Sequence, residues 1–234
     1  MNIYNIADLN VVLECEEWTL RNAEKYIIDS NDIVPDIYIK TPKEDIRKIP
    51  NPNIDYATGA YLLEGKLFYK ELISKYKGTM LHASAVVVDE KAYLFSAPCG
   101  TGKSTHTSKW LELFGDGAYI LNDDKPAIRV LDDGIYAYGT PWSGKHDISV
   151  NKRVKLQAIC FLNRDTTNWI KPMEDHDKIV NLYYATIKRI EKDLASNLFD
   201  IIGDIIDKVP IYTMGCTPTI DSAKMAYNVM SEGV

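Results

Sequence analysis

The chain has 234 residues, of which 46% are hydrophobic and 10% aromatic, enough for a well-buried core. Its formal net charge of −6 argues against a general nucleic-acid binder, and no apolar run approaches the roughly 20 residues that span a bilayer. Because the N-terminus lacks a secretory signal and the four cysteines form no CxxC pair, we expect a cytoplasmic protein with reduced thiols.

Residues 1–78 predict a small α+β subdomain. Short apolar runs predict strands at residues 10–15 and 36–40, with a helix over residues 18–26 between them. A longer helix is expected over residues 56–76, closed by Gly78. This region carries no recognisable chemistry.

Residues 79–234 predict an α/β core, because strands and helices alternate along this part of the chain. One helix is expected to end near Phe114, where Gly115 follows. Short apolar runs and a hairpin signal at Asp132-Asp133-Gly134 predict strands at residues 83–88, 92–96, 118–121, 127–131, 135–138 and 155–162.

The C-terminal part is predicted to be mostly helical. Pro210 breaks the chain before a strand at residues 211–216, and Asp221 is expected to cap a last helix. An apolar stripe at helical spacing predicts core packing, and it consists of Leu194, Leu198, Ile201, Ile202, Ile205 and Ile206.

The strongest functional signal is a glycine-rich segment between a predicted strand and a predicted helix, the setting that a phosphate-binding loop requires. It reads Ala-Pro-Cys-Gly-Thr-Gly-Lys-Ser-Thr over residues 97–105 and departs from Gly-x4-Gly-Lys-Ser/Thr only at its first position. Backbone N–H groups of such a loop converge on phosphate oxygens, aided by the helix dipole. We expect Lys103 to reach the β- and γ-phosphates and Ser104 to hold Mg²⁺. The expected nucleotide contacts are Pro98, Cys99, Gly100, Thr101, Gly102, Lys103, Ser104 and Thr105.

An acidic pair, Asp123-Asp124, ends the next predicted strand. In a β-α-β unit that strand commonly lies beside the loop strand, so its carboxyl end would face the phosphates. One carboxylate can support Mg²⁺ while the other accepts a proton from an attacking hydroxyl. An acidic surface turn is the alternative, but the adjacent phosphate loop favours a functional role.

Two further segments are candidates. His82 begins the strand two elements before the loop, where a structural histidine is the alternative. Residues 139–146 read Gly-Thr-Pro-Trp-Ser-Gly-Lys-His and predict a loop that closes over the phosphates. Lys145 would then neutralise charge that develops during transfer. The alternative is an ordinary surface loop with a half-buried Trp142.

Taken together, these segments resemble a known family. The run His-Ala-Ser-Ala at residues 82–85, the glycine-rich segment and Asn-Asp-Asp at residues 122–124 are similar to the kinase core shared by HPr kinase/phosphorylase and ATP-dependent phosphoenolpyruvate carboxykinase. The resemblance is closest to bacterial HPr kinase-related proteins, some of which phosphorylate serine on ribosomally made peptides. It covers about residues 79–165 and implies a mixed central sheet flanked by helices. Thr105 stands where HPr kinase has glutamate, so the resemblance does not extend to HPr as the acceptor.

The resemblance also implies roles for single residues. It implies Asp123 as the base that accepts the hydroxyl proton, with His82 near the base or the metal. It implies Lys103 and Ser104 on phosphate and Mg²⁺, with Asp124 supporting the metal. A homo-oligomer is compatible with it, because HPr kinases assemble into hexamers.

The leading prediction is an ATP-dependent phosphotransferase, with GTP as a possible donor. It would act on a hydroxyl, foremost serine, of a peptide, protein or small molecule. One alternative is a nucleotide-binding regulatory protein with little or no ATPase activity. Another is a small-molecule kinase that uses the N-terminal region as its acceptor pocket.

Overall fold

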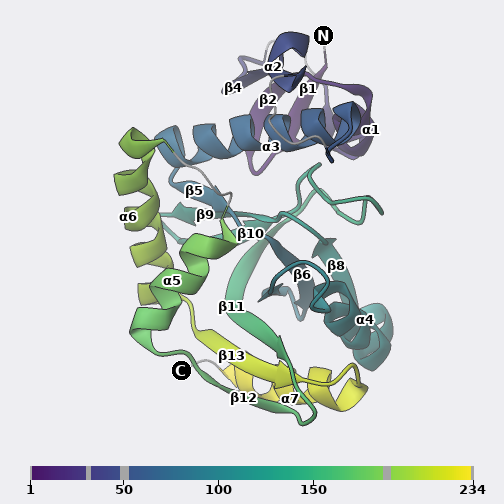
Figure 1. Cartoon of the computed structure of the whole chain (residues 1–234), viewed down its shortest axis with the longest axis vertical. Coiled ribbons are helices and arrows are strands. Elements are labelled where there is room, and N and C mark those ends of the chain that lie inside the picture. The colour runs from purple at the N-terminus through teal and green to yellow at the C-terminus, as the bar shows by residue number, and fades with distance from the viewer. Residues whose placement is uncertain (1, 30–32, 48–52, 187–190, 233–234) are drawn as a thin grey trace.

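The computed structural model describes residues 2–29, 33–47, 53–186 and 191–232. They form a mixed α/β structure with two sheets, and the smaller sheet packs at one end of the larger (Figure 1). Among the described helices, none has the length and apolar character that crossing a membrane requires. All four cysteines are unpaired thiols, as the sequence predicts.

The smaller sheet has the strand order β3-β1-β2-β4. Two of its strands match the predicted ones, β2 (Leu9–Glu14) and β4 (Ile37–Lys40), which pair in parallel. Two strands, β1 (Ile3–Ile6) and β3 (Ile27–Ile28), were not predicted, because they are too short to show an alternating pattern.

Three helices accompany this sheet. The predicted helix over residues 18–26 divides into α1 (Glu17–Ala23) and a 3-10 turn, and a short α2 (Lys43–Arg47) was not predicted. The long α3 (Tyr56–Lys75) was predicted, and the Asp55 side chain caps it by accepting a hydrogen bond from the Thr58 N–H at 2.7 Å.

The prediction that Gly78 closes this helix is wrong. The C-cap of α3 is Tyr76, and Gly78 instead opens β5 (Gly78–Met80), which pairs with β9 of the larger sheet. A Cβ atom on Gly78 would lie 3.0 Å from the Ile128 carbonyl oxygen, so glycine serves the close pairing of the strands here.

The larger sheet has nine strands in the order β5-β9-β10-β11-β7-β6-β8, with β13 on β11 and β12 on β13. The long β11 pairs in parallel with both β7 and β13, while β6 pairs antiparallel with both β7 and β8. The sheet is therefore mixed, as predicted. Its strands after β5 are β6 (Ala83–Val88), β7 (Lys91–Ser96), β8 (Ala118–Asn122), β9 (Ala127–Leu131), β10 (Gly134–Tyr138), β11 (Arg153–Arg164), β12 (Trp169–Pro172) and β13 (Ile211–Cys216).

Helices cover both faces of this sheet (Figure 1). Alternate residues of β6 and β7 separate two apolar clusters: Val86 and Phe95 pack with α4 and α7, whereas Val87 and Leu94 belong to a cluster shared with α3 and α6. The helices are α4 (Lys103–Phe114), a 3-10 turn (Gly115–Gly117), α5 (Asp175–Ala185), α6 (Lys192–Lys208) and α7 (Ile220–Glu232).

Two details of the C-terminal half differ from the predictions. The strand β12 was missed, because it is short and includes a proline at its end. Asp221 is not the cap of α7 but lies in its first turn, since the helix begins at Ile220. The apolar stripe of α6 is confirmed as core, with Leu198, Ile201 and Ile205 buried.

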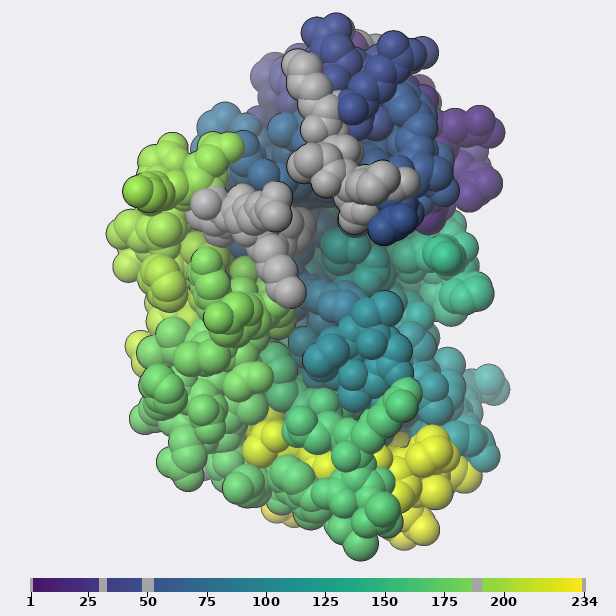
Figure 2. All heavy atoms as spheres, viewed as in Figure 1, coloured from purple at the N-terminus to yellow at the C-terminus, as the bar shows by residue number. Residues whose placement is uncertain are grey.

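One apolar cluster extends from the small sheet through α3 to the large sheet and α6. Figure 2 shows the described residues up to residue 78, coloured purple to blue, stacked directly on the core. The division of the chain into domains at residue 78 stays a prediction, but packing is continuous across that boundary.

Candidate active site

The glycine-rich segment forms a loop, residues 97–102, between the end of β7 and the start of α4; we call it the glycine loop. Gly100 and Gly102 have φ angles of +76° and +119°, which side chains with a Cβ rarely adopt. A Cβ atom built on either glycine meets nothing within 4 Å, so open space lies beside both. The loop therefore has the backbone conformation and the adjacent room that an anion needs.

Lys103 spans the base of the glycine loop. Its side chain is buried, and its ammonium donates a hydrogen bond of 3.0 Å to the Ala97 carbonyl oxygen. Burial lowers the pKa of Lys103, and the nearby charges of Asp124 and Asp123 oppose that shift. The Lys103 ammonium is therefore stabilised by both carboxylates. Ser104, the next residue, is exposed on the first turn of α4.

Arg164 fastens the glycine loop from the end of β11. Its Nε donates a hydrogen bond of 3.2 Å to the Thr101 carbonyl oxygen, and its guanidinium also donates to the Gly100 carbonyl oxygen. Arg164 was not predicted from the sequence, because only the parallel pairing of β7 with β11 brings it to the loop.

The acidic pair reaches the glycine loop differently from the prediction. The strand β8 does not lie beside β7, because β6 pairs with both and separates them. Since β6 is antiparallel to its two neighbours, the carboxyl ends of β7 and β8 still lie at one edge of the sheet. The start of β6 lies between them, and the Ala83 N–H donates to the Asp124 carbonyl oxygen at 3.0 Å. Asp123, Asp124 and His82 are therefore brought to the edge that carries the loop.

Asp123 is oriented by its neighbours. The Ser84 hydroxyl donates a hydrogen bond of 2.6 Å to Asp123 Oδ1, and Ser84 Oγ lies 2.9 Å from Thr107 Oγ1 on α4. The Asp123 N–H donates to the Ile148 carbonyl oxygen at 3.0 Å. Ser84 therefore fixes one oxygen of the carboxylate. Asp123 is only half-buried, so it remains partly exposed to solvent.

Asp124 lies between two basic groups. His82 Nε2 is 3.6 Å from Asp124 Oδ1, and the Lys125 ammonium pairs with Oδ2. The same ammonium lies 5.5 Å from the centre of the Tyr61 ring on α3. Lys125 was not identified in the sequence, although its place after two aspartates was a visible signal.

The donor set fits Mg²⁺ only with help from a nucleotide. The described part of the chain contains no group of three or more His, Cys, Asp or Glu side chains that could hold a metal ion. Mg²⁺ is commonly bound by one or two carboxylates together with substrate phosphates and waters. The Ser104 hydroxyl and the Asp124 carboxylate match that pattern.

The prediction that residues 139–146 form a loop that closes over the phosphates is wrong for residues 139–143. Residues 139–143 are buried, and the Trp142 ring is fully buried and stacked on Phe68 at 5.0 Å between ring centres. The Asn122 side chain donates to the Thr140 carbonyl oxygen at 2.9 Å, and the Asn22 side chain donates to the Pro141 carbonyl oxygen at 3.1 Å. These contacts fix the segment, and we call residues 139–144 the wall. Its polar sequence does not reveal the contacts with the core.

Lys145 is exposed at the tip of this wall. The preceding Gly144 lies against Asp124, because a Cβ atom on Gly144 would be 3.4 Å from the Asp124 Cβ. The Gly144 N–H also donates to the Tyr61 hydroxyl at 2.9 Å. The tip is thus anchored beside the acidic pair, and a catalytic role for the Lys145 ammonium stays a prediction.

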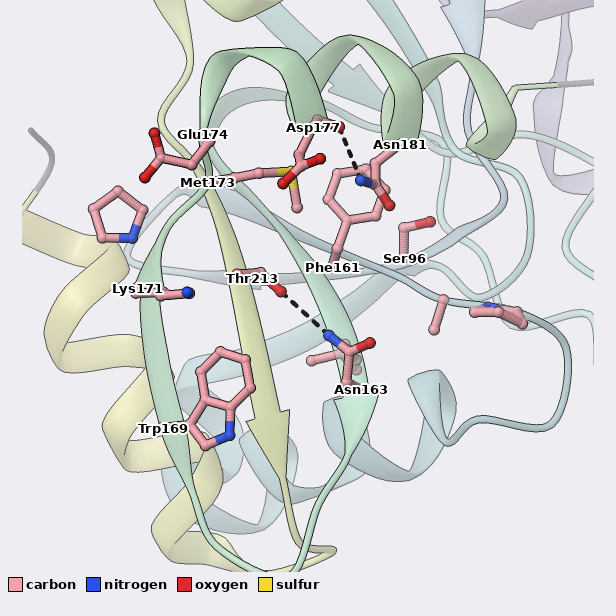
Figure 3. Close-up of a pocket in the computed structure, with 14 residues that line it drawn as sticks. Ser96, Phe161, Asn163, Trp169, Lys171, Met173, Glu174, Asp177, Asn181 and Thr213 are labelled. Atoms are coloured by element: carbon pink, nitrogen blue, oxygen red, sulfur yellow. Dashed lines mark hydrogen bonds between the residues drawn. The ribbon is translucent and has the colours of Figure 1, made fainter.

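Three cavities adjoin the glycine loop. One of about 290 Å³ lies at its second half, against Thr101, Thr105, Arg164 and Thr217. Two others, of about 500 and 450 Å³, meet at its first half and share lining residues; we call them together the long groove. The larger of the two is drawn in Figure 3. The shared residues are Ser96, Ala97, Pro98, Phe161 and Asn181.

Comparison with known proteins finds similarity among solved structures and none in sequence. No family model matches the chain, and no curated protein matches it. Among solved structures, the HPr(Ser) kinase/phosphatase from Coxiella burnetii matches with a TM-score of 0.38 and 14% sequence identity. That match covers 65% of this chain and 91% of the other. At this level of likeness, only the chain's own residues bear on its chemistry.

Proposed function

We propose that this protein is an ATP-dependent phosphotransferase that moves the γ-phosphoryl group to a serine-type hydroxyl. The observation that carries the proposal is the placement of Asp123. Its carboxylate is held by Ser84 at the sheet edge that also presents the glycine loop and Lys103. A base is needed for transfer to a hydroxyl and not for nucleotide binding alone.

The triphosphate would lie along the glycine loop. Open space beside Gly100 and Gly102 admits phosphate oxygens to backbone N–H groups, and the N-terminus of the 12-residue α4 favours negative charge. The Lys103 ammonium would exchange its bond to the Ala97 carbonyl for the β- and γ-phosphates. The nucleoside, from ATP or GTP, would enter the 290 Å³ cavity, where Arg164, Asp165 and Thr217 offer polar contacts.

The transfer requires one proton acceptor and charge neutralisation. The acceptor oxygen forms a bond to the γ-phosphorus while the bond from phosphorus to the β–γ bridging oxygen breaks, and that electron pair leaves with the nucleoside diphosphate. The hydroxyl proton passes to Asp123. Lys103 would neutralise charge on the transferred group, and we expect Lys145 to add to this. Mg²⁺ bound by Ser104 and Asp124 would neutralise further phosphate charge.

The central test is Asp123→Asn, which keeps the shape and removes the base. We expect phosphate transfer from labelled ATP to a panel of serine peptides and small hydroxyl compounds to fall by about 10²–10⁴-fold. ATP affinity measured by calorimetry should change less than about twofold, because binding depends on the loop. Asp116→Asn, an exposed carboxylate in the 3-10 turn after α4, is the matched control and should leave both values unchanged.

Two results would contradict the assignment. If Asp123→Asn loses binding as well as transfer, Asp123 holds the metal and is not the base. If the unmutated protein binds ATP and phosphorylates nothing in the panel, a nucleotide-binding regulatory protein becomes the better description.

A second variant tests the phosphate site itself. Lys103→Ala removes a charge-assisted contact to phosphate worth about 1.5–3 kcal/mol, so the affinity for Mg-ATP should fall at least about tenfold. Lys109→Ala, on the same helix and paired with Glu112, is the matched control. Equal affinities in the two variants would remove the basis for a phosphate site at the loop.

A further inference from the structure

The long groove begins beside the proposed reaction centre. Its near end is lined by His82, Pro98, Cys99 and Tyr184, so it opens on the histidine that lies 3.6 Å from Asp124. An acceptor hydroxyl that enters this end comes beside the glycine loop and His82. This is the opposite half of the loop from the 290 Å³ cavity, so both substrates can be bound at once.

The far end of the groove is a preformed surface. Its floor is the face of β11, β13 and β12, and α5 borders it (Figure 3). Trp169 is held there, because its Nε1 donates to Asp165 Oδ2 at 2.7 Å and its ring packs on the glycine of the neighbouring strand. A Cβ atom on Gly215 would lie 2.2 Å from Trp169 Nε1, so only glycine leaves room for this position of the ring.

The charges at the far end are unbalanced. Two carboxylates of the α5 side, Glu174 and Asp177, line the cavity. Neither carboxylate forms an ion pair with a basic group in the part of the chain that the structure describes. The adjacent Asp175, by contrast, pairs with Lys178 at 2.7 Å. Lys171, the basic residue of the cavity, instead lies 5.9 Å from the centre of the Trp169 ring.

We propose that the long groove binds the phosphate acceptor as an extended peptide segment, with a basic side chain of that segment against Glu174 and Asp177. This deepens the proposed function and rests on it. The two joined cavities extend well beyond His82, so a free amino acid would leave the far end empty, whereas a chain of several residues fills both. The lining combines buried apolar floor at Phe161 and Met173 with polar edges, which suits alternating side chains of an extended strand.

The test compares peptide binding and peptide phosphorylation. The probes are fluorescein-labelled 12-residue peptides with one serine and either three arginines or three glutamates at matched positions. With the unmutated protein and Mg-ATP, the basic peptide should bind more tightly by fluorescence anisotropy and be the better substrate. In the double variant Glu174→Gln/Asp177→Asn, its affinity and kcat/KM should fall about fivefold, because each exposed ion pair contributes only modestly to binding. ATP affinity should not change.

Asp175→Asn is the matched control, since this carboxylate lies on the same helical turn but already pairs with Lys178. It should leave peptide affinity unchanged. The groove assignment is overturned if basic and acidic peptides bind equally, if the double variant behaves like Asp175→Asn, or if small hydroxyl compounds are phosphorylated while no peptide is bound. In each of these cases ATP binding and transfer to another acceptor would leave the proposed function intact, whereas loss of ATP binding by the unmutated protein would refute both.

Discussion

His106 is a buried histidine that follows the glycine loop by one helical turn. Its backbone N–H donates to the Gly102 carbonyl oxygen at 2.8 Å. The Trp110 indole donates to His106 Nε2 at 3.3 Å, and Ser222 Oγ lies 3.4 Å from Nδ1. Because an indole can only donate, Nε2 accepts and the ring proton is on Nδ1. A second ring proton would meet the indole N–H, so this environment holds a neutral ring.

Stability should therefore depend on pH through His106. Burial lowers its pKa to about 4 from 6.5, so the unfolded state takes up the proton first as the pH falls. The stabilisation is complete above pH 6.5 and is lost as the pH falls towards 4, by roughly 3 kcal/mol at about 1.4 kcal/mol per unit. Urea unfolding between pH 7 and 4 should show this loss in the unmutated protein and a flatter profile in His106→Gln. Parallel profiles would contradict it.

The wall, residues 139–144, differs from the conformation that its sequence predicts. Its polar and glycine-rich sequence predicts a mobile loop, yet three side-chain amides and hydroxyls fix it and Trp142 fills the core. The neighbouring α3 contributes to this, since a Cβ atom on Gly65 would lie 2.8 Å from Trp142 Cδ1. A sequence pattern shows local polarity. It does not show that the Trp142 ring packs against Gly65, which lies 77 positions earlier in the chain.

We therefore expect Trp142 to be insensitive to ligands. In a Trp18→Phe/Trp169→Phe variant, the fluorescence of the two buried tryptophans, Trp110 and Trp142, should not change when Mg-ATP and acceptor bind. Acrylamide should quench this emission poorly in both states. Gly65→Ala should shift the emission, because the added methyl group displaces the ring. A shift on ligand addition in the Trp18→Phe/Trp169→Phe variant would instead support a loop that closes.

The elements around the reaction centre were largely predictable, and their arrangement only in part. Strand β7, helix α4 and strand β8 follow from short apolar runs and from glycines, and the structure confirms them within one or two residues. The order of β6 between β7 and β8 was not predictable, because strand pairing depends on contacts distant in sequence. The same reason hid Arg164 and the far end of the long groove.

At the scale of the whole molecule, α3 connects the two sheets. Its Glu64 is fully buried and accepts hydrogen bonds from the Glu16 N–H at 2.8 Å and from the Thr19 hydroxyl. Burial raises the pKa of this carboxyl. On the same helix, Phe68 stacks on Trp142 of the wall. Helix α3 therefore forms hydrogen bonds with Glu16 and Thr19 on one side and packs against the wall on the other.

We expect the two sheets to unfold together. Urea unfolding followed by circular dichroism and by tryptophan fluorescence should give one coincident transition, because the apolar cluster is continuous. Glu64→Ala should lower the stability of the whole chain by about 2–4 kcal/mol, since it leaves the buried Thr19 hydroxyl and the partly buried Glu16 N–H without an acceptor. Glu71→Ala, on the solvent side of α3 beside Lys75, should cost less than about 0.5 kcal/mol. Two separate transitions would instead support independent domains divided near residue 78.

The pairing of β6 with β8 contains an irregularity: Ala85 lies opposite Asn122, and the next residue, Val86, lies opposite Ile120. One extra residue, Leu121, is thus accommodated in β8, two positions before Asp123. Since successive side chains of a strand point to opposite faces, the parity of this insertion decides which face of the sheet Asp123 serves. A one-residue deletion in β8 would therefore restore regular pairing and turn the Asp123 side chain to the opposite face of the sheet.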